Sequence, residues 1–102
     1  MKADLSIKDA RVVTHSGEFY GGVAARDGAI VAVGADDSLP EARREIDAGG
    51  LCLMPGVIDP HCHLGVNYPY DEDMQTETAA AASGGLTTVL LYIRTKEPSY
   101  IP

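Results

Sequence analysis

The first 34 residues alternate short apolar or β-branched runs with turn residues. Four such runs, each of which predicts a short β-strand, lie at residues 5–7, 12–14, 22–25 and 29–33. Asp27-Gly28 separates the last two runs, and this dipeptide tolerates the positive φ angles of a two-residue type I′ turn. Ser16-Gly17 is a weaker turn candidate of the same kind. The start of the chain is therefore predicted to be a set of strands that includes at least one antiparallel hairpin.

A polar connector joins this β-rich start to the middle of the chain. Residues 34–44 are rich in Asp, Ser and Pro, which favour a turn, and we expect one helical turn at residues 41–44. Residues 45–47 are predicted to form another short strand. Turn-rich sequence then gives way to a continuous apolar run, so the sequence predicts two segments, residues 1–52 and 53–102.

The apolar run at residues 51–64 ends in two histidines. If residues 57–59 form a buried strand that continues past the following proline, successive side chains alternate between its two faces. His61 and His63 then lie on one face and Cys62 on the other. We call His61 and His63 the histidine pair.

A helical pattern follows the histidine pair after an irregular, polar loop. The helix is predicted over residues 73–83, with acidic residues at its start, where the helix dipole favours negative charge, and glycines at its end. Its packed face is expected to carry Met74, Thr78, Ala81 and Ala82. A β-branched apolar run at residues 86–93 comes next. The order strand, helix, strand predicts a right-handed βαβ unit with a parallel sheet.

Composition and charge exclude several kinds of partner. With 8 basic and 15 acidic residues the net charge is −7, and no basic cluster interleaves with aromatic residues, which argues against nucleic acid. No apolar run reaches the roughly 18 residues of a membrane span, and the N-terminus lacks a signal-peptide pattern, so we expect no membrane partner and a cytoplasmic location. The 102 residues are also far fewer than the roughly 250 of an eight-stranded α/β barrel.

The histidine pair is the strongest candidate for chemistry. An isolated His-x-His is more often an ordinary loop feature, but this one follows a strand that opens a βαβ unit, at the edge where α/β proteins place their active sites. Two imidazoles can hold a metal ion if other elements add ligands and leave a position for water. Asp59 either accepts a hydrogen bond from a ligand histidine or makes a turn, and the sequence does not separate these. Tyr68 and Tyr70 either line a pocket or anchor the loop.

Two longer motifs carry a resemblance to a known family. They are Met54-Pro55-Gly56-Val57-Ile58-Asp59-Pro60-His61-Cys62-His63-Leu64 and Thr76-Glu77-Thr78-Ala79-Ala80-Ala81-Ala82-Ser83-Gly84-Gly85-Leu86-Thr87-Thr88-Val89. In this order and at this spacing they strongly resemble the amidohydrolase superfamily. Within it the match is to the cyclic amidohydrolases: dihydropyrimidinases, hydantoinases, allantoinases and dihydroorotases. The resemblance covers nearly all of this chain, but only about the first quarter of a family member.

The resemblance implies an α/β fold in which strands of a small β-sandwich precede the first βαβ unit of a metal-dependent (β/α)₈ TIM barrel, incomplete in this chain. It implies that His61 and His63 bind the more buried of two divalent metals, usually zinc. The bridging lysine, the further histidines and the proton-transferring aspartate of the family match no position in this sequence. We therefore expect this segment alone to be inactive and to need the remainder of the barrel, in the same or a cleaved chain, and we expect a homo-oligomer.

One departure from the family narrows the implied substrate. Dihydroorotases carry an arginine two residues after the second histidine, where it pairs with the substrate carboxylate, but this chain has Gly65. A neutral cyclic amide such as a hydantoin or a dihydropyrimidine therefore fits better. Two alternatives stay open: a deaminase of the same superfamily acting on a nucleobase-like ring, and a non-catalytic assembly module related to dihydropyrimidinase.

Overall fold

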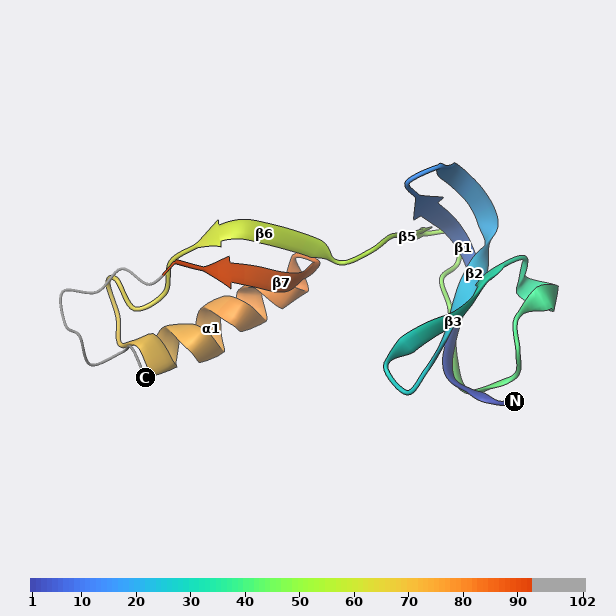
Figure 1. The fold of residues 1–102 in the computed structure, drawn as a ribbon, viewed down its shortest axis with the longest axis horizontal. Helices are drawn as coiled ribbons and strands as arrows, with labels where there is room; N and C mark the ends of the chain where they lie inside the picture. The colour runs from blue at the N-terminus through green and yellow to red at the C-terminus, as the bar shows by residue number, and fades with distance from the viewer. Residues whose placement is uncertain (93–102) are drawn as a thin grey trace. The chain divides into compact units, whose positions relative to one another are not determined.

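Residues 1–92 are described by the computed structural model, in which the chain divides between Pro55 and Gly56 into two units. The first unit contains a single five-stranded sheet (Figure 1). Its strands are β1 (Ala3–Thr14), β2 (Gly17–Arg26), β3 (Ala29–Gly34), β4 (Ala42–Asp47) and β5 (Cys52–Leu53). The order across the sheet is β3-β2-β1-β4, and β5 also pairs with β1. The assignment of this segment to a β-sandwich stays a prediction, since the described strands form only one layer.

β1 lies at the centre of this sheet because it pairs on both of its edges. It runs antiparallel to β2 and parallel to β4 and β5. Its inward positions are mostly small, and Ala3, Ser6 and Ala10 are each at most 1% exposed. Small side chains at these positions bury little apolar volume, so the core of this unit is thin and formed largely by β1.

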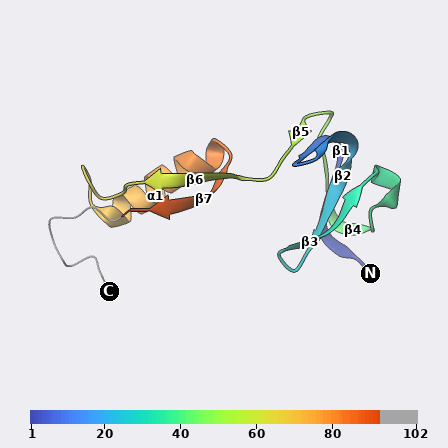
Figure 2. The same cartoon turned by 45° about the horizontal axis from the view of Figure 1, so that its top comes forward.

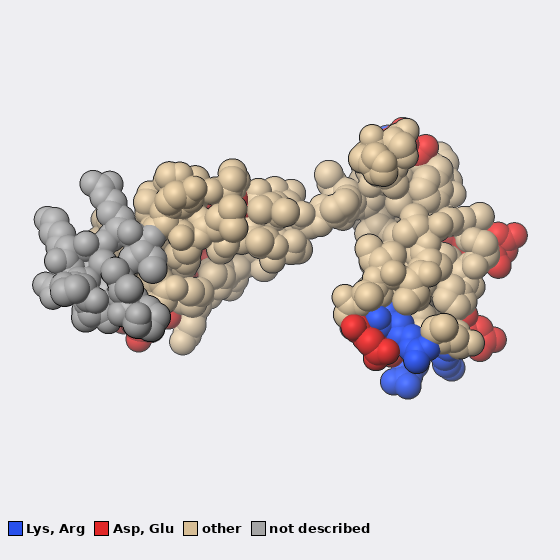
Figure 3. All heavy atoms as spheres, viewed as in Figure 1, with Lys and Arg blue, Asp and Glu red and all other residues tan. Residues whose placement is uncertain are grey.

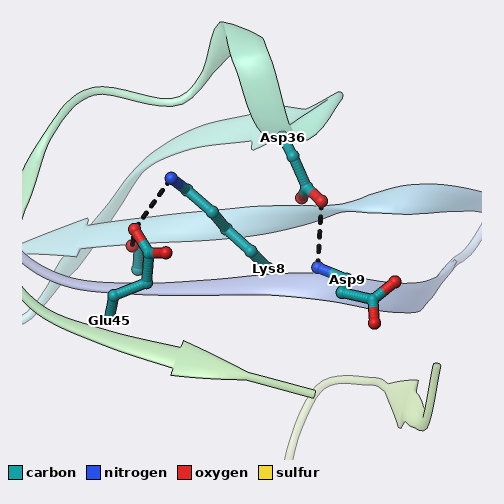
Figure 4. A network of polar contacts seen from close by, with 5 residues as sticks. Lys8, Asp9, Asp36 and Glu45 are labelled. Carbon is teal, nitrogen blue, oxygen red and sulfur yellow. Dashed lines mark hydrogen bonds and ion pairs between the residues drawn. The ribbon is translucent and has the colours of Figure 1, made fainter. Parts of the chain in front are cut away.

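A bulge interrupts β1 at Asp9. The register with β2 shifts between Ile7 and Ala10, and Asp9 has a φ of 50°. The backbone N–H of Asp9 donates to Asp36 Oδ2 at 3.0 Å (Figure 4), which stabilises this unusual backbone conformation. The neighbouring Lys8 pairs with Glu45 at 2.7 Å, and this hydrogen bond is the main reason why the pKa of Lys8 lies above its usual value.

Two expectations for this unit were wrong. Residues 5–7 and 12–14 belong to the same strand, because the bulge at Asp9 absorbs the break that the sequence pattern suggested. Residues 41–44 contain no helical turn, because Ala42 already pairs with Ala3 in a parallel ladder that continues to Asp47. In both cases pairing with a distant segment overrides the local preference.

The hairpin at Asp27-Gly28 is confirmed. β2 and β3 run antiparallel, and Arg26 pairs with Ala29 across the two-residue turn. Asp27 and Gly28 have φ angles of 50° and 76°, the positive values that a type I′ turn requires. The N–H of Asp27 also donates to Asp4 Oδ2 at 2.8 Å, which ties the turn to the start of β1.

The second unit begins at Gly56, and its described part, up to residue 92, contains two strands and one helix. They are β6 (Val57–Cys62), α1 (Tyr70–Ser83) and β7 (Leu86–Leu91). β6 and β7 form a parallel pair, and α1 lies along them in both ribbon views (Figures 1 and 2). The predicted order strand, helix, strand is thus present. The predicted end of the second strand at Ile93 lies outside the described residues.

α1 begins three residues earlier than predicted, directly after Pro69, which fixes the backbone at the helix start. Asp71, Glu72 and Asp73 occupy its first turn, as expected from the helix dipole. Met74, Thr78 and Ala81 on the predicted packed face are half-buried. Ala82 is exposed, so the packed face is narrower than expected.

The expected burial of β6 is not seen. Val57 and Ile58 are 47% and 60% exposed, because β7 is the only strand that pairs with β6 among residues 1–92 and α1 packs mainly against β7.

Within the same residues, no helix is long and apolar enough to cross a membrane. On the face of the first unit drawn in Figure 3, basic side chains lie next to acidic ones, which agrees with the ion pairs of Lys8 with Glu45 and of Arg43 with Asp4.

Candidate metal site

The histidine pair converges at the carboxyl end of β6. His61 belongs to the strand and His63 follows it directly. The two Nε2 atoms lie 3.0 Å apart, and the rings meet edge to face with an interplanar angle of 76°. The period-2 pattern of an extended chain therefore brings both imidazoles to one face. Their assignment as metal ligands stays a prediction.

The distance between the two ring nitrogens suits a shared metal ion. Zinc is bound by imidazole nitrogen at about 2.0–2.1 Å, so two ligands at a tetrahedral angle have nitrogens about 3.3 Å apart. The observed 3.0 Å separation of the Nε2 atoms is close to that value. Two neutral imidazoles are also donors that suit zinc. The residues present thus fit the metal that the resemblance implies, as half of a ligand set.

The tautomer of His63 follows from its second ring nitrogen. His63 Nδ1 lies 2.8 Å from the backbone carbonyl oxygen of Tyr92. A carbonyl oxygen only accepts hydrogen bonds, so Nδ1 must carry the proton and Nε2 must present a lone pair when the ring is neutral. Ligand histidines in proteins almost always donate their other N–H in this way, which fixes the ring orientation.

Tyr92 is the residue of this site that sequence reasoning missed. Its N–H donates to the carbonyl of Cys62 at 2.9 Å, which continues the β6–β7 pairing by one residue. Its ring stacks on His61 with a centroid distance of 4.3 Å and an interplanar angle of 12°. Parallel pairing of the predicted strands could have located it, because the residue after β7 then lies beside the end of β6.

Asp59 contacts the backbone of the pair. Its Oδ1 accepts a hydrogen bond from the N–H of His61 at 3.0 Å. This is the geometry of a turn made by an Asp side chain two residues before the amide, one of the two interpretations that the sequence left open. The alternative role, in which the carboxylate supports a ligand histidine ring, stays a prediction.

The loop after the pair is tied to the start of α1. The N–H of Gly65 donates to Asp73 Oδ2 at 2.9 Å. A hollow of about 500 Å³ lies between this loop, α1 and the strands, and its lining includes His63, Asp59 and Tyr68. Tyr68 therefore lines a hollow beside His63. The carboxylate of Asp73 holds the loop in place.

No further ligands join the pair within the described part of the chain. Among residues 1–92, no group of three or more His, Cys, Asp or Glu side chains is arranged to hold a metal ion. His15 lies in the turn between β1 and β2, in the other unit. Free cysteines are usually small buried residues, and the sequence predicts this for Cys52, but the prediction was wrong: Cys52 is exposed and accepts a hydrogen bond from Arg11.

Comparison with known proteins identifies relatives of the chain, although no family model matches it. An L-hydantoinase of Paenarthrobacter aurescens is 36% identical over 94 residues, covering 85% of this chain and 19% of the relative. An allantoinase of Enterococcus faecalis is 43% identical over 94 residues, covering 88% of this chain and 20% of the relative. The chain thus spans about one fifth of the length of the curated relatives it matches.

Solved structures give the same picture. An L-hydantoinase (dihydropyrimidinase) from Arthrobacter aurescens matches with a TM-score of 0.72 at 36% identity, covering 85% of this chain and 20% of that one. An N-acyl-D-glutamate deacylase from Bordetella bronchiseptica, solved with zinc and a phosphonate inhibitor, matches with a TM-score of 0.68 at 29% identity, covering 89% of this chain and 19% of that one.

These findings agree with the fold and with the position of the histidine pair. The chain is homologous to the N-terminal part of enzymes of the amidohydrolase superfamily. Within that superfamily, its relatives named hydantoinase and allantoinase belong to the cyclic amidohydrolase branch.

Proposed function

We propose that this chain is the N-terminal part of a metal-dependent hydrolase that cleaves the C–N amide bond of a neutral cyclic amide, of the hydantoin or dihydropyrimidine class. The observation that carries the proposal is the convergence of the histidine pair, whose Nε2 atoms lie 3.0 Å apart at the end of a strand that opens a parallel unit. The names of the hydantoinase and allantoinase relatives support the same reaction.

In this proposal β6, α1 and β7 form the first βαβ unit of a (β/α)₈ barrel, and the five-stranded unit belongs to a β-sandwich beside it. Active sites of such barrels lie at the carboxyl ends of the strands, which is where His61 and His63 are found. Most of the barrel would come from sequence beyond these residues. The segment alone is expected to be inactive, and the complete protein to be a cytoplasmic homo-oligomer.

His61 and His63 would hold one divalent metal, which we propose to be zinc, as part of a two-metal site. When bound, the metal supplies Lewis acidity and makes a water-derived nucleophile available near neutral pH. The chain's own contribution is to hold the Nε2 atoms of both histidines close together at the end of one strand. The carbonyl of Tyr92 fixes the His63 ring by accepting a hydrogen bond from Nδ1, and Asp59 fixes the backbone of His61 by accepting a hydrogen bond from its N–H.

Gly65 supports a neutral substrate. The resemblance places a carboxylate-binding arginine at this position in dihydroorotases. Here Gly65 has a φ of 75°, and a Cβ added to it would lie 3.1 Å from Cβ of Tyr70. An arginine would therefore be strained and crowded at this position. With glycine there, residue 65 supplies no positive charge to pair with an anionic ring.

The proposal is tested by ring-opening assays on the complete protein with hydantoin, dihydrouracil, allantoin and dihydroorotate. We expect turnover of one of the neutral rings, loss of activity after metal removal, recovery with zinc, and much weaker turnover of dihydroorotate. Two metals per active site are expected. One metal with deamination would instead indicate the related deaminase, and the absence of metal and activity would indicate a non-catalytic assembly module.

A further inference from the structure

Tyr92 touches the candidate metal site in three separate ways. Its N–H donates to Cys62, its carbonyl oxygen lies 2.8 Å from Nδ1 of His63, and its ring stacks on His61. These contacts join one residue, just past the end of β7, to three consecutive residues at the end of β6. Neither strand could shift relative to the other without breaking at least one of them.

We propose that Tyr92 is a positioning residue for the histidine pair, which fixes one ring through its backbone and the other through its side chain. The proposal rests on the metal-binding role proposed above for His61 and His63. It adds that the site depends on an aromatic ring that is not itself a ligand.

The two rings of the pair need different supports. The proton on Nδ1 of His63 is held by the carbonyl of Tyr92, so this ring is fixed by the backbone whatever side chain residue 92 carries. The orientation of the His61 ring comes from the stack, in which the two planes differ by only 12° at a centroid distance of 4.3 Å. This geometry lies within the range of favourable aromatic pairs.

The stack matters because it limits rotation of His61 about its side-chain bonds. An exposed imidazole at a strand end samples several rotamers, and the one in the structure points Nε2 toward Nε2 of His63. Restricting His61 to that rotamer before metal binding removes part of the ordering cost of binding. Loss of an aromatic pair is expected to weaken zinc binding by roughly three- to tenfold.

The test uses the complete protein and three variants. Tyr92→Phe keeps the ring, Tyr92→Leu removes it but keeps an apolar side chain, and both leave the backbone carbonyl in place. Tyr20→Leu is the matched control, because Tyr20 is an exposed tyrosine in β2 of the other unit. Zinc affinity is measured by competition with a chelator. We expect Tyr92→Phe and Tyr20→Leu to bind within twofold of the unmodified protein, and Tyr92→Leu to bind roughly three- to tenfold more weakly.

A second measurement does not depend on metal. In metal-free protein with labelled histidine, the nuclear Overhauser effect between the rings of His61 and His63 reports their convergence, and His61→Gln and His63→Gln variants assign the signals. The effect should persist in Tyr92→Phe and be clearly weaker in Tyr92→Leu. An undiminished effect together with undiminished zinc affinity in Tyr92→Leu would overturn the positioning role, as would equal losses in the Phe and Leu variants.

The two measurements also separate this inference from the function on which it rests. If the unmodified protein binds no zinc, the proposed function fails, whereas the Overhauser effect in the Phe and Leu variants still decides whether Tyr92 positions the pair.

Discussion

Gly56 is the position where a substitution is expected to change the stability of the second unit most clearly. A Cβ added to Gly56 would lie 2.6 Å from Cβ of Thr87, and closer still to Oγ1 and Cγ2 of the same side chain. Rotation of Thr87 moves Oγ1 and Cγ2 but leaves its Cβ in place, so the clash can be relieved only by a backbone shift. The next residue, Val57, is hydrogen-bonded to Gly85 at 3.0 Å, and such a shift would strain that bond.

The expected loss for Gly56→Ala follows from two opposing terms. Overpacking a close contact costs about 1–3 kcal/mol. Replacing glycine lowers the entropy of the unfolded chain and returns about 0.4–1 kcal/mol. We therefore expect the second unit to lose about 1–2 kcal/mol, which corresponds to roughly five- to thirtyfold more frequent opening.

Amide hydrogen exchange measures this loss locally. The Val57 amide should exchange faster in Gly56→Ala by the factor given above. Gly84→Ala is the matched control, because Gly84 has an ordinary φ of −88° and its nearest contact would be 3.4 Å away. Gly56→Ala should also cost less in a protein that carries Thr87→Gly, since the clashing Cβ is then absent. Equal exchange in the two alanine variants, or an undiminished cost beside Thr87→Gly, would refute the steric argument.

Two further substitutions test the supports of the candidate site. Asp59→Ala should remove the hydrogen bond to the N–H of His61 and weaken zinc binding by several-fold. Asp59→Asn keeps an acceptor oxygen, so it should bind zinc nearly as well as the unmodified protein. If the Asn variant loses as much zinc affinity as the Ala variant, the negative charge matters and the carboxylate supports the ligand ring. Asp73→Ala should speed amide exchange at Gly65 by roughly 5- to 160-fold, since a lost hydrogen bond to a charged acceptor costs about 1–3 kcal/mol, while Asp73→Asn should have a smaller effect. Unchanged exchange at Gly65 in the Ala variant would contradict this role of Asp73.

Features set by neighbouring residues could be predicted from the sequence. The hairpin at Asp27-Gly28 depends on the φ preferences of those two residues, and the placement of His61 and His63 on one face depends on the period of an extended strand. The order strand, helix, strand could also be predicted from the sequence, because the spacing of the hydrophobic residues changes from one element to the next.

Features set by distant contacts could not be predicted in the same way. The bulge at Asp9 is stabilised by a hydrogen bond to Asp36, which lies 27 positions later in the chain. No local sequence pattern predicts that hydrogen bond. β4 forms where a helical turn was expected because its partner is the start of β1. Tyr92 joins the site through its backbone carbonyl and its stack on His61, and these follow from the pairing of β6 with β7.

The same limit explains the exposed strands of the second unit. The motif around Gly56 and Val57 predicts a buried strand, yet Val57 is half-exposed because only β7 and α1 are present to cover it among the described residues. The burial of a strand depends on all the elements that pack against it, and this chain spans only about one fifth of the length of its relatives.

The central claim is that the histidine pair binds a catalytic metal in the complete protein. The most direct measurement is the metal content of the purified complete protein, by mass spectrometry, beside that of the His61→Ala/His63→Ala double variant and of His15→Ala as a matched control. We predict about two divalent metal ions, proposed to be zinc, per active site in the unmodified protein and in His15→Ala. The double variant should contain clearly less metal. An unmodified protein without metal, or a double variant that keeps its full content, would contradict the claim.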